Sequence, residues 1–161
     1  MLQISKVDEL RNIQCFTQNP SPLEKNVVVV HTSLLRCHEE YDVAKCHMLA
    51  KQFEHEPYLW APIIVDRDHG IILDGHHRCA AVGFVFSDAY IPTLVLGDYQ
   101  NNSSIKVLAW DTGKPFCRKQ VTSAGMTGHL LRKKTTRHIF GVQIEDWHRE
   151  KKMKFPILKS P

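Results

Sequence analysis

The chain has 161 residues, of which 43% are hydrophobic and 24% charged, a composition typical of soluble globular proteins and not of disordered or fibrous chains. This length favours one domain over residues 1–161. Apolar runs too short to cross a bilayer exclude a membrane span, and the N-terminus lacks the apolar stretch of a signal peptide. With five cysteines in no paired spacing, we expect a cytoplasmic protein with reduced thiols and no membrane partner.

The net charge of +4 conceals an uneven distribution. Residues 1–113 contain 9 Lys and Arg against 14 Asp and Glu, whereas residues 114–161 contain 12 against 3. A basic C-terminal third suits nucleic acid, the phosphates of a nucleotide or an acidic partner. For the last stretch, about 145–161, we expect a solvated basic tail.

Apolar periodicity predicts strands that alternate with helices. A valine-rich strand is expected at 26–35, and a helix at 39–53 would place Glu39 and Glu40 in its first turn. Further elements are expected as a hairpin of strands at 63–66 and 71–73, a helix at 77–86, strands at 91–96 and 105–110, and a helix at about 121–131. This order indicates a mixed α/β or an α+β domain.

The most informative segment is the turn Asp74-Gly75-His76-His77-Arg78, between a predicted strand and a predicted helix. The start of a helix offers unpaired backbone N–H groups and the positive end of the helix dipole, and Arg78 adds a planar set of donors. Gly75 allows a tight turn and a close approach of the backbone to a ligand. The turn is therefore a candidate phosphate site, although an ordinary corner with Asp74 as helix cap explains part of the pattern.

This turn resembles the signature of the ParB/sulfiredoxin-like superfamily, and its double histidine resembles the branch of free L-serine kinases. Three further segments match that branch in the same order: Cys37-His38-Glu39-Glu40, Ile105–Trp110 and Lys134-Thr135-Thr136-Arg137-His138. Four ordered matches over about residues 27–140 are far more specific than any one of them.

The resemblance implies an α+β fold in which helices pack on a mixed sheet. It also implies an enzyme that transfers a phosphoryl group from ADP or ATP to free L-serine with Mg²⁺, giving O-phospho-L-serine. The expected partners are thus L-serine and a purine nucleotide. Only 24 residues, 111–134, lie where the family has a longer insertion, which leaves both donors open.

The same resemblance assigns roles to residues. Glu39 is the expected general base, with Glu40 as the alternative if the match is displaced by one residue. Gly75, His76, His77 and Arg78 are expected to bind the nucleotide phosphates. Asp74 is a second expected catalytic residue and the candidate ligand of Mg²⁺. The residues expected to bind the amino acid are Trp110, Thr135, Thr136, Arg137 and His138.

The alternative function is that of a ParB-like protein that binds nucleic acid or acts as a nucleotide switch. The basic C-terminal third favours it, but residues 111–161 show no clear pair of helices of the helix-turn-helix kind. We therefore do not expect nucleic acid as a partner.

Overall fold

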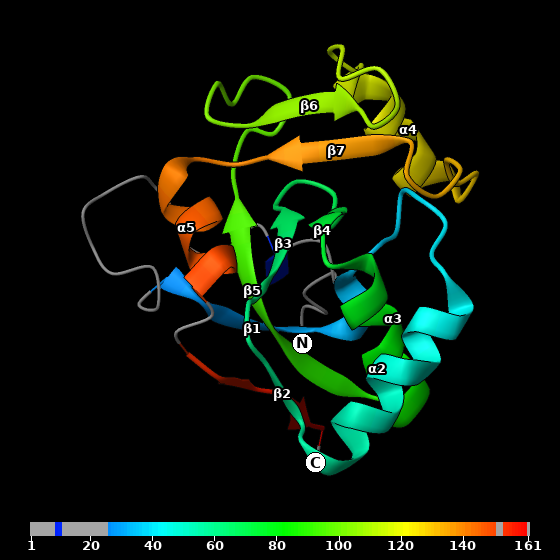
Figure 1. Ribbon diagram of the computed structural model, residues 1–161, viewed down its shortest axis with the longest axis vertical. Coiled ribbons are helices and arrows are strands. Elements are labelled where there is room, and N and C mark those ends of the chain that lie inside the picture. Colours follow the sequence, from blue (N-terminus) through cyan, green and yellow to red (C-terminus); the bar gives the residue numbers. More distant parts are fainter. Residues whose placement is uncertain (1–8, 11–25, 151–152, 161) are drawn as a thin grey trace, which may run out of the picture.

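A mixed β-sheet forms the centre of the fold in the computed structural model, which describes residues 9–10, 26–150 and 153–160 (Figure 1). β5 runs parallel to β3 and antiparallel to β1, and β3 forms an antiparallel hairpin with β4. The order of these strands across the sheet is β1 (Val28–His31), β5 (Ala89–Leu96), β3 (Ile63–Asp66) and β4 (Ile72–Asp74).

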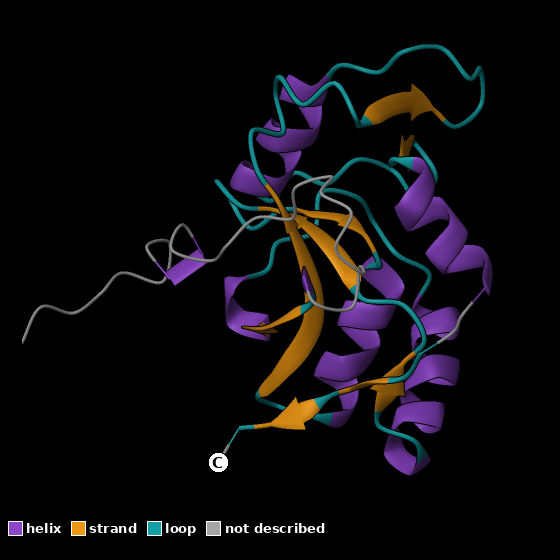
Figure 2. Cartoon of the chain, turned by 90° about the vertical axis from the view of Figure 1, so that its left-hand side faces the viewer, coloured by secondary structure: helices purple, strands orange, loops and turns teal. Residues whose placement is uncertain are grey.

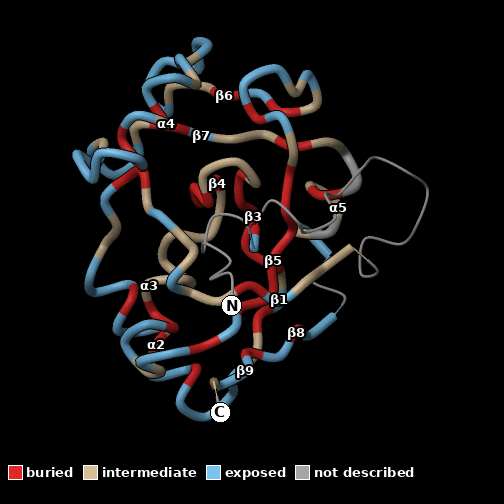
Figure 3. Tube along the Cα trace, turned by 180° about the vertical axis from the view of Figure 1, so that it is seen from behind, coloured by how far each residue is buried: buried red, intermediate tan, exposed pale blue. Residues whose placement is uncertain are grey.

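Helices cover both faces of this sheet, as Figure 2 shows. Because side chains alternate along a strand, Ile63 and Val65 of β3 join one apolar cluster and Ile64 joins the other. The first cluster is completed by α2 (Val43–His55) and α3 (His76–Val85), and the second by α4 (Arg118–Thr127) and α5 (Val142–Glu150). All of β3 is buried, and its trace lies in the interior in Figure 3.

Two short antiparallel pairs complete the described structure. β6 (Lys106–Ala109) pairs with β7 (Thr136–Ile139) and lies beyond the upper ends of β3 and β4 in Figure 1. β2 (Tyr58–Leu59) pairs with β8 (Phe155–Pro156). The predicted α+β fold, a mixed sheet with helices packed on it, is confirmed.

Three predicted boundaries are wrong by four residues. The helix predicted at about 121–131 spans Arg118–Thr127, because Gly128 adopts a left-handed conformation and ends it. The first strand ends at His31 because Thr32–Leu34 form a short 3₁₀ turn. The helix predicted from residue 39 begins at Val43, because the Asp42 side chain caps it by accepting a hydrogen bond from the Lys45 backbone N–H at 3.1 Å. Glu39 and Glu40 therefore precede the helix and do not lie in its first turn.

The C-terminal stretch expected to be a solvated tail is part of the fold. Phe155 and Ile157 are only 7% and 5% exposed and join the two apolar clusters. β8 pairs with β2, and β9 (Leu158–Lys159) pairs with the start of β5. Pairing with β2 and β5, and not the count of lysines, decides where this segment lies.

Two observations bear on the alternative partners. α4 and α5 are separated by β7, so these two helices do not form a helix-turn-helix unit. None of the described helices combines the length and apolar character needed to cross a bilayer.

We expect the same substitution, glycine to alanine, to change stability in opposite directions at two positions. A Cβ added at Gly125 in α4 would lie 2.8 Å from Cγ1 of the fully buried Ile71, whereas one added at Gly83 in α3 would meet nothing within 4 Å. We expect Gly125→Ala to lower the free energy of unfolding by about 1 kcal/mol because the core becomes overpacked. Gly83→Ala should raise it by about 0.5–1 kcal/mol. Urea denaturation of both variants measures the two signs, and a stabilising Gly125→Ala would show that α4 does not pack this closely.

Candidate functional site

A cavity of about 520 Å³ brings together nearly all the residues that the sequence singled out. Its walls come from the segment before α2, from the turn between β4 and α3, and from the start of β7 with Trp110 beside it. The predicted residues in the wall are Glu39, Asp74, Gly75, His76, His77, Arg78, Trp110, Thr136, Arg137 and His138. Thr135 does not line the cavity, since its hydroxyl donates to the Arg132 carbonyl oxygen at 2.5 Å.

The N-terminus of α3 opens into this cavity without a side-chain cap. Gly75 is the residue before the helix and adopts φ 101°, a left-handed conformation that favours glycine. A Cβ at this position would also lie 2.6 Å from Cγ2 of the buried Ile63. Asp74 forms no cap here, so that alternative is wrong. The first N–H groups of α3 have no partner within the helix and are available to an anion.

The Arg78 guanidinium is held in place by hydrogen bonds to the protein. Its guanidinium donates to Asp74 Oδ2 at 2.8 Å, to the Pro62 carbonyl oxygen at 3.2 Å and to the Ala61 carbonyl oxygen. Most of its donors are therefore already used by the protein. Arg78 fixes the Asp74 carboxylate and brings a positive charge to the cavity wall.

Glu39 is buried and held by a strand that is distant in sequence. Its Oε2 accepts hydrogen bonds from the Thr136 hydroxyl at 2.8 Å and from the Thr136 backbone N–H at 3.1 Å. The backbone of Glu40 donates to the Leu131 carbonyl oxygen, which ties the same segment to the turn before β7. These contacts use one carboxylate oxygen of Glu39 and leave Oε1 for another partner.

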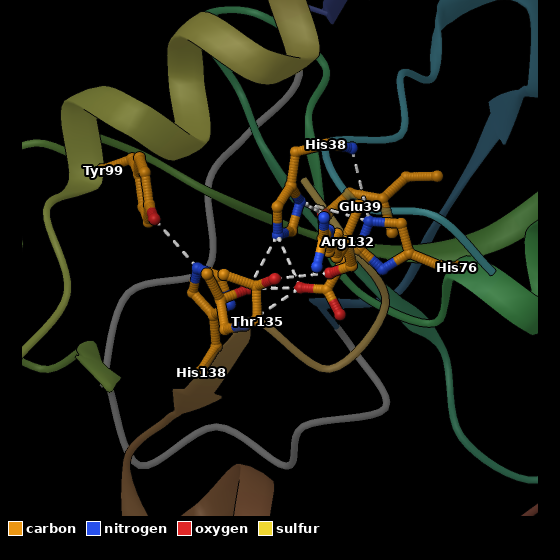
Figure 4. Close-up of polar contacts among 9 residues, drawn as sticks. His38, Glu39, His76, Tyr99, Arg132, Thr135 and His138 are labelled. Carbon is orange, nitrogen blue, oxygen red and sulfur yellow. Dashed lines mark hydrogen bonds and ion pairs between the residues drawn. The ribbon is translucent and has the colours of Figure 1, made fainter. Parts of the chain in front are cut away.

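His38 lies behind Glu39 and is 1% exposed (Figure 4). Its Nδ1 is 2.7 Å from the Ile72 carbonyl oxygen, and its Nε2 is 3.0 Å from the Thr136 hydroxyl. His76 Nε2 also lies 3.1 Å from His38 Nδ1. No role was predicted for His38, although it is adjacent to Glu39 in the matched segment.

The histidines around the cavity resist protonation. Burial lowers the pKa of His38, His76 and His77, and it lowers the pKa of His138 to about 3. Neighbouring imidazoles add to the effect on His76 and His138. These side chains are therefore neutral at pH 7, and each can donate only one N–H. His77 Nε2 accepts from the Asp42 backbone N–H, which leaves Nδ1–H as its donor.

Cationic side chains, rather than the histidines, supply the positive charge of the cavity. Lys45 of α2 and Lys134 before β7 line it together with Arg78 and Arg137. No role was predicted for either lysine, although Lys134 begins the matched segment at 134–138. Lys45 lies in the first turn of α2, close to Glu39 and Glu40 in the sequence. Trp110 is 51% exposed and its ring lies 5.5 Å from the Arg137 guanidinium carbon, so it is not a core residue.

The donor set for a divalent cation is small. No group of three or more His, Cys, Asp or Glu side chains in the described residues is arranged to hold a metal ion. Asp74 has one oxygen committed to Arg78, and its Oδ1 remains. This fits Mg²⁺ only when phosphates and water provide most of the ligands, as Mg²⁺ commonly requires.

Comparisons with known proteins bear on the fold. No family model matches this chain, and no curated protein does. A solved structure of a free serine kinase in complex with AMP has a TM-score of 0.62 at 13% identity, over 71% of this chain and 88% of that one. SbnI with a C-terminal truncation, from Staphylococcus aureus, has a TM-score of 0.57 at 11% identity, over 74% and 85%. The fold implied by the sequence resemblance is thereby confirmed.

The depressed pKa of His138 predicts acid sensitivity. The unfolded chain takes up this proton near pH 6.5, whereas the folded protein does so only near pH 3, so stability is lost as the pH falls through this window. Between pH 7 and 5, the loss in His138→Gln should be smaller than in the parent protein by up to about 2 kcal/mol. Urea denaturation at both pH values measures it.

Tyr99→Phe is the matched control for this prediction. It removes the partner of His138, whose Nε2 lies 2.8 Å from the Tyr99 hydroxyl, but it keeps the titrating imidazole. Its stability should fall without losing the pH dependence. An unchanged pH dependence in His138→Gln would contradict the assignment.

Proposed function

We propose that this protein is a kinase that transfers a phosphoryl group from ADP or ATP to free L-serine, giving O-phospho-L-serine. One observation carries the proposal: a single cavity contains both an uncapped helix N-terminus and a buried carboxylate with a free oxygen. Phosphoryl transfer requires these two elements, a cradle for phosphate and a group that accepts the proton of the attacking hydroxyl.

The phosphate end of the site is the turn from Gly75 to Arg78. Backbone N–H groups at the start of α3 bind the phosphate oxygens, and His77 adds Nδ1–H. Lys45 and Arg78 offset the negative charge that the phosphate chain brings into the cavity. Mg²⁺ held by Asp74 would supply further charge neutralisation.

The acceptor end is formed by Glu39, Glu40 and the start of β7. The guanidinium of Arg137, placed against Trp110, suits the serine carboxylate. The exposed carboxylate of Glu40 suits the serine ammonium. Thr136 acts through Glu39, because its hydroxyl and N–H are used to orient that carboxylate.

The reaction then needs one proton transfer and one substitution. Glu39 Oε1 takes the hydroxyl proton of serine as serine Oγ forms a bond to the terminal phosphorus. The bond from that phosphorus to the bridging oxygen breaks, and this oxygen leaves with AMP or ADP. The cavity holds donor and acceptor in line, which is the main contribution a protein makes to this reaction.

The Thr136 hydroxyl lies between two hydrogen-bond acceptors, Glu39 Oε2 and His38 Nε2. His38 Nδ1–H must donate to the Ile72 carbonyl oxygen, so Nε2 of a neutral His38 can only accept. The single hydroxyl proton of Thr136 cannot serve both His38 Nε2 and Glu39 Oε2, although Thr136 Oγ1 is within 3.0 Å of each. The Thr136 hydroxyl therefore donates to the ionised Glu39, and it can turn to His38 Nε2 once Glu39 holds the proton of serine. We assign Thr136 and His38 as positioning residues that orient the Glu39 carboxyl group in both states.

Glu39→Gln tests the base. The amide retains the shape but cannot accept the serine proton, so kcat should fall by about 10²–10⁴-fold with little change in nucleotide binding. Glu40→Gln should instead raise KM for serine and leave kcat nearly intact. Product mass after incubation with ADP or ATP and serine measures both, and the reverse pattern would identify Glu40 as the base.

Thr136→Val tests the positioning of Glu39. Loss of the hydroxyl removes one hydrogen bond to Glu39 and the link to His38, so kcat should fall by roughly tenfold or more, in line with a hydrogen bond to a charged group. Thr136→Ser should restore the rate. Thr135→Val changes a hydroxyl that lies outside the cavity and serves as the matched control. A Thr136→Val enzyme as active as Thr135→Val would remove Thr136 from the mechanism.

A further inference from the structure

A second cavity, of about 510 Å³, adjoins the phosphate end of the candidate site. It lies among α2, the β2 segment, the start of α3 and α5. Leu49 and Arg78 belong to the walls of both cavities. The two hollows are therefore neighbours, and the Arg78 side chain stands at their boundary.

The walls of the second cavity differ in character from those of the first. Apolar and aromatic side chains dominate it, among them Phe53, Leu59 and Trp60, whereas the first cavity is lined by imidazoles, carboxylates and cations. The rings of Tyr58 and Trp60 meet edge to face, with centroids 5.6 Å apart. Lys154 Nζ lies 4.2 Å and 5.3 Å from the two ring centroids and helps to hold them in place.

One buried polar atom at this cavity lacks a hydrogen bond among the described residues. His148 Nε2 is shielded from solvent and has no hydrogen-bond partner among the described residues. The closest carboxylate oxygen is Asp74 Oδ2 at 3.7 Å, beyond hydrogen-bond range. Burial lowers the pKa of His148, so the neutral ring can pair with a heterocycle that has both donors and acceptors on its edge.

We infer that this second cavity binds the nucleobase of a purine nucleotide whose phosphates lie in the first cavity. The inference rests on the proposed function. A planar aromatic base can stack on Trp60, whose ring stands edge to face against Tyr58, and its polar edge can pair with His148 and Gln52, which also line the cavity. The phosphate groups of the nucleotide then extend past Arg78, whose positive charge lies where the two cavities meet.

The experiment compares two probes by calorimetry on the full chain: ADP, and inorganic tripolyphosphate, which has no base. Trp60→Ala should weaken ADP binding by about tenfold, in line with the loss of one base–aromatic stack, and leave tripolyphosphate binding unchanged. Trp60→Phe, which retains an aromatic face, should recover most of the loss.

Phe84→Ala is the matched control. Phe84 is an aromatic residue on α3, 45% exposed, that lines neither cavity. It should change the binding of neither probe. Circular dichroism and thermal unfolding establish that each variant is folded.

The outcomes distinguish a failure of the proposed base site from a failure of the proposed kinase function. If the parent protein binds both probes and Trp60→Ala binds ADP as tightly as Phe84→Ala does, the base lies elsewhere and the proposed kinase function stands. Equal weakening of ADP and tripolyphosphate in Trp60→Ala also overturns the base site. If the parent protein binds neither probe, the proposed function and this inference both fail.

Discussion

The hydrogen bonds between Glu39 and Thr136 are the interaction on which the rest of the site depends. A carboxylate in a buried position is costly unless hydrogen bonds or opposite charges compensate it. Here both donors come from one residue 97 positions away, so the segment before α2 and the start of β7 must meet in register. That requirement fixes β7, and with β7 it fixes β6, Trp110 and Arg137 at the cavity.

Burial also determines which groups carry charge in the cavity. Four imidazoles surround it, and desolvation opposes the protonated form of each. A site built on imidazolium ions would lose phosphate affinity as they deprotonate. Permanent cations and backbone N–H groups do not titrate in the physiological range, so the attraction for an anion depends little on pH between 7 and 9. The histidines instead orient neighbours, as His77 does for Asp42, the residue that caps α2.

The sequence predicted most of the sheet and α3, because apolar alternation and the Gly75 turn are local signals. It failed where distant residues decide the outcome. The position of Phe155 depends on its pairing with Leu59 of β2, which no local pattern records. The helix start at Val43 is a different case, because the Asp42 cap that sets it is a local signal that the prediction overlooked. For the site, the matched segments predicted its members, but not that the donors of Arg78 are occupied by backbone carbonyls. His38, which contacts the Thr136 hydroxyl, was visible only as a neighbour of Glu39.

Arg78 shows why a site and its fold cannot be treated separately here. Its guanidinium holds the carbonyls before β3, the carboxylate at the end of β4 and the first turn of α3 in one arrangement. The same charge stands at the boundary between the two cavities. A lysine would keep the charge but could not satisfy three acceptors in a plane, because its ammonium lacks the planar donor fork. The strand–turn–helix corner therefore needs arginine for its geometry, and the candidate site acquires a fixed cation from that structural need.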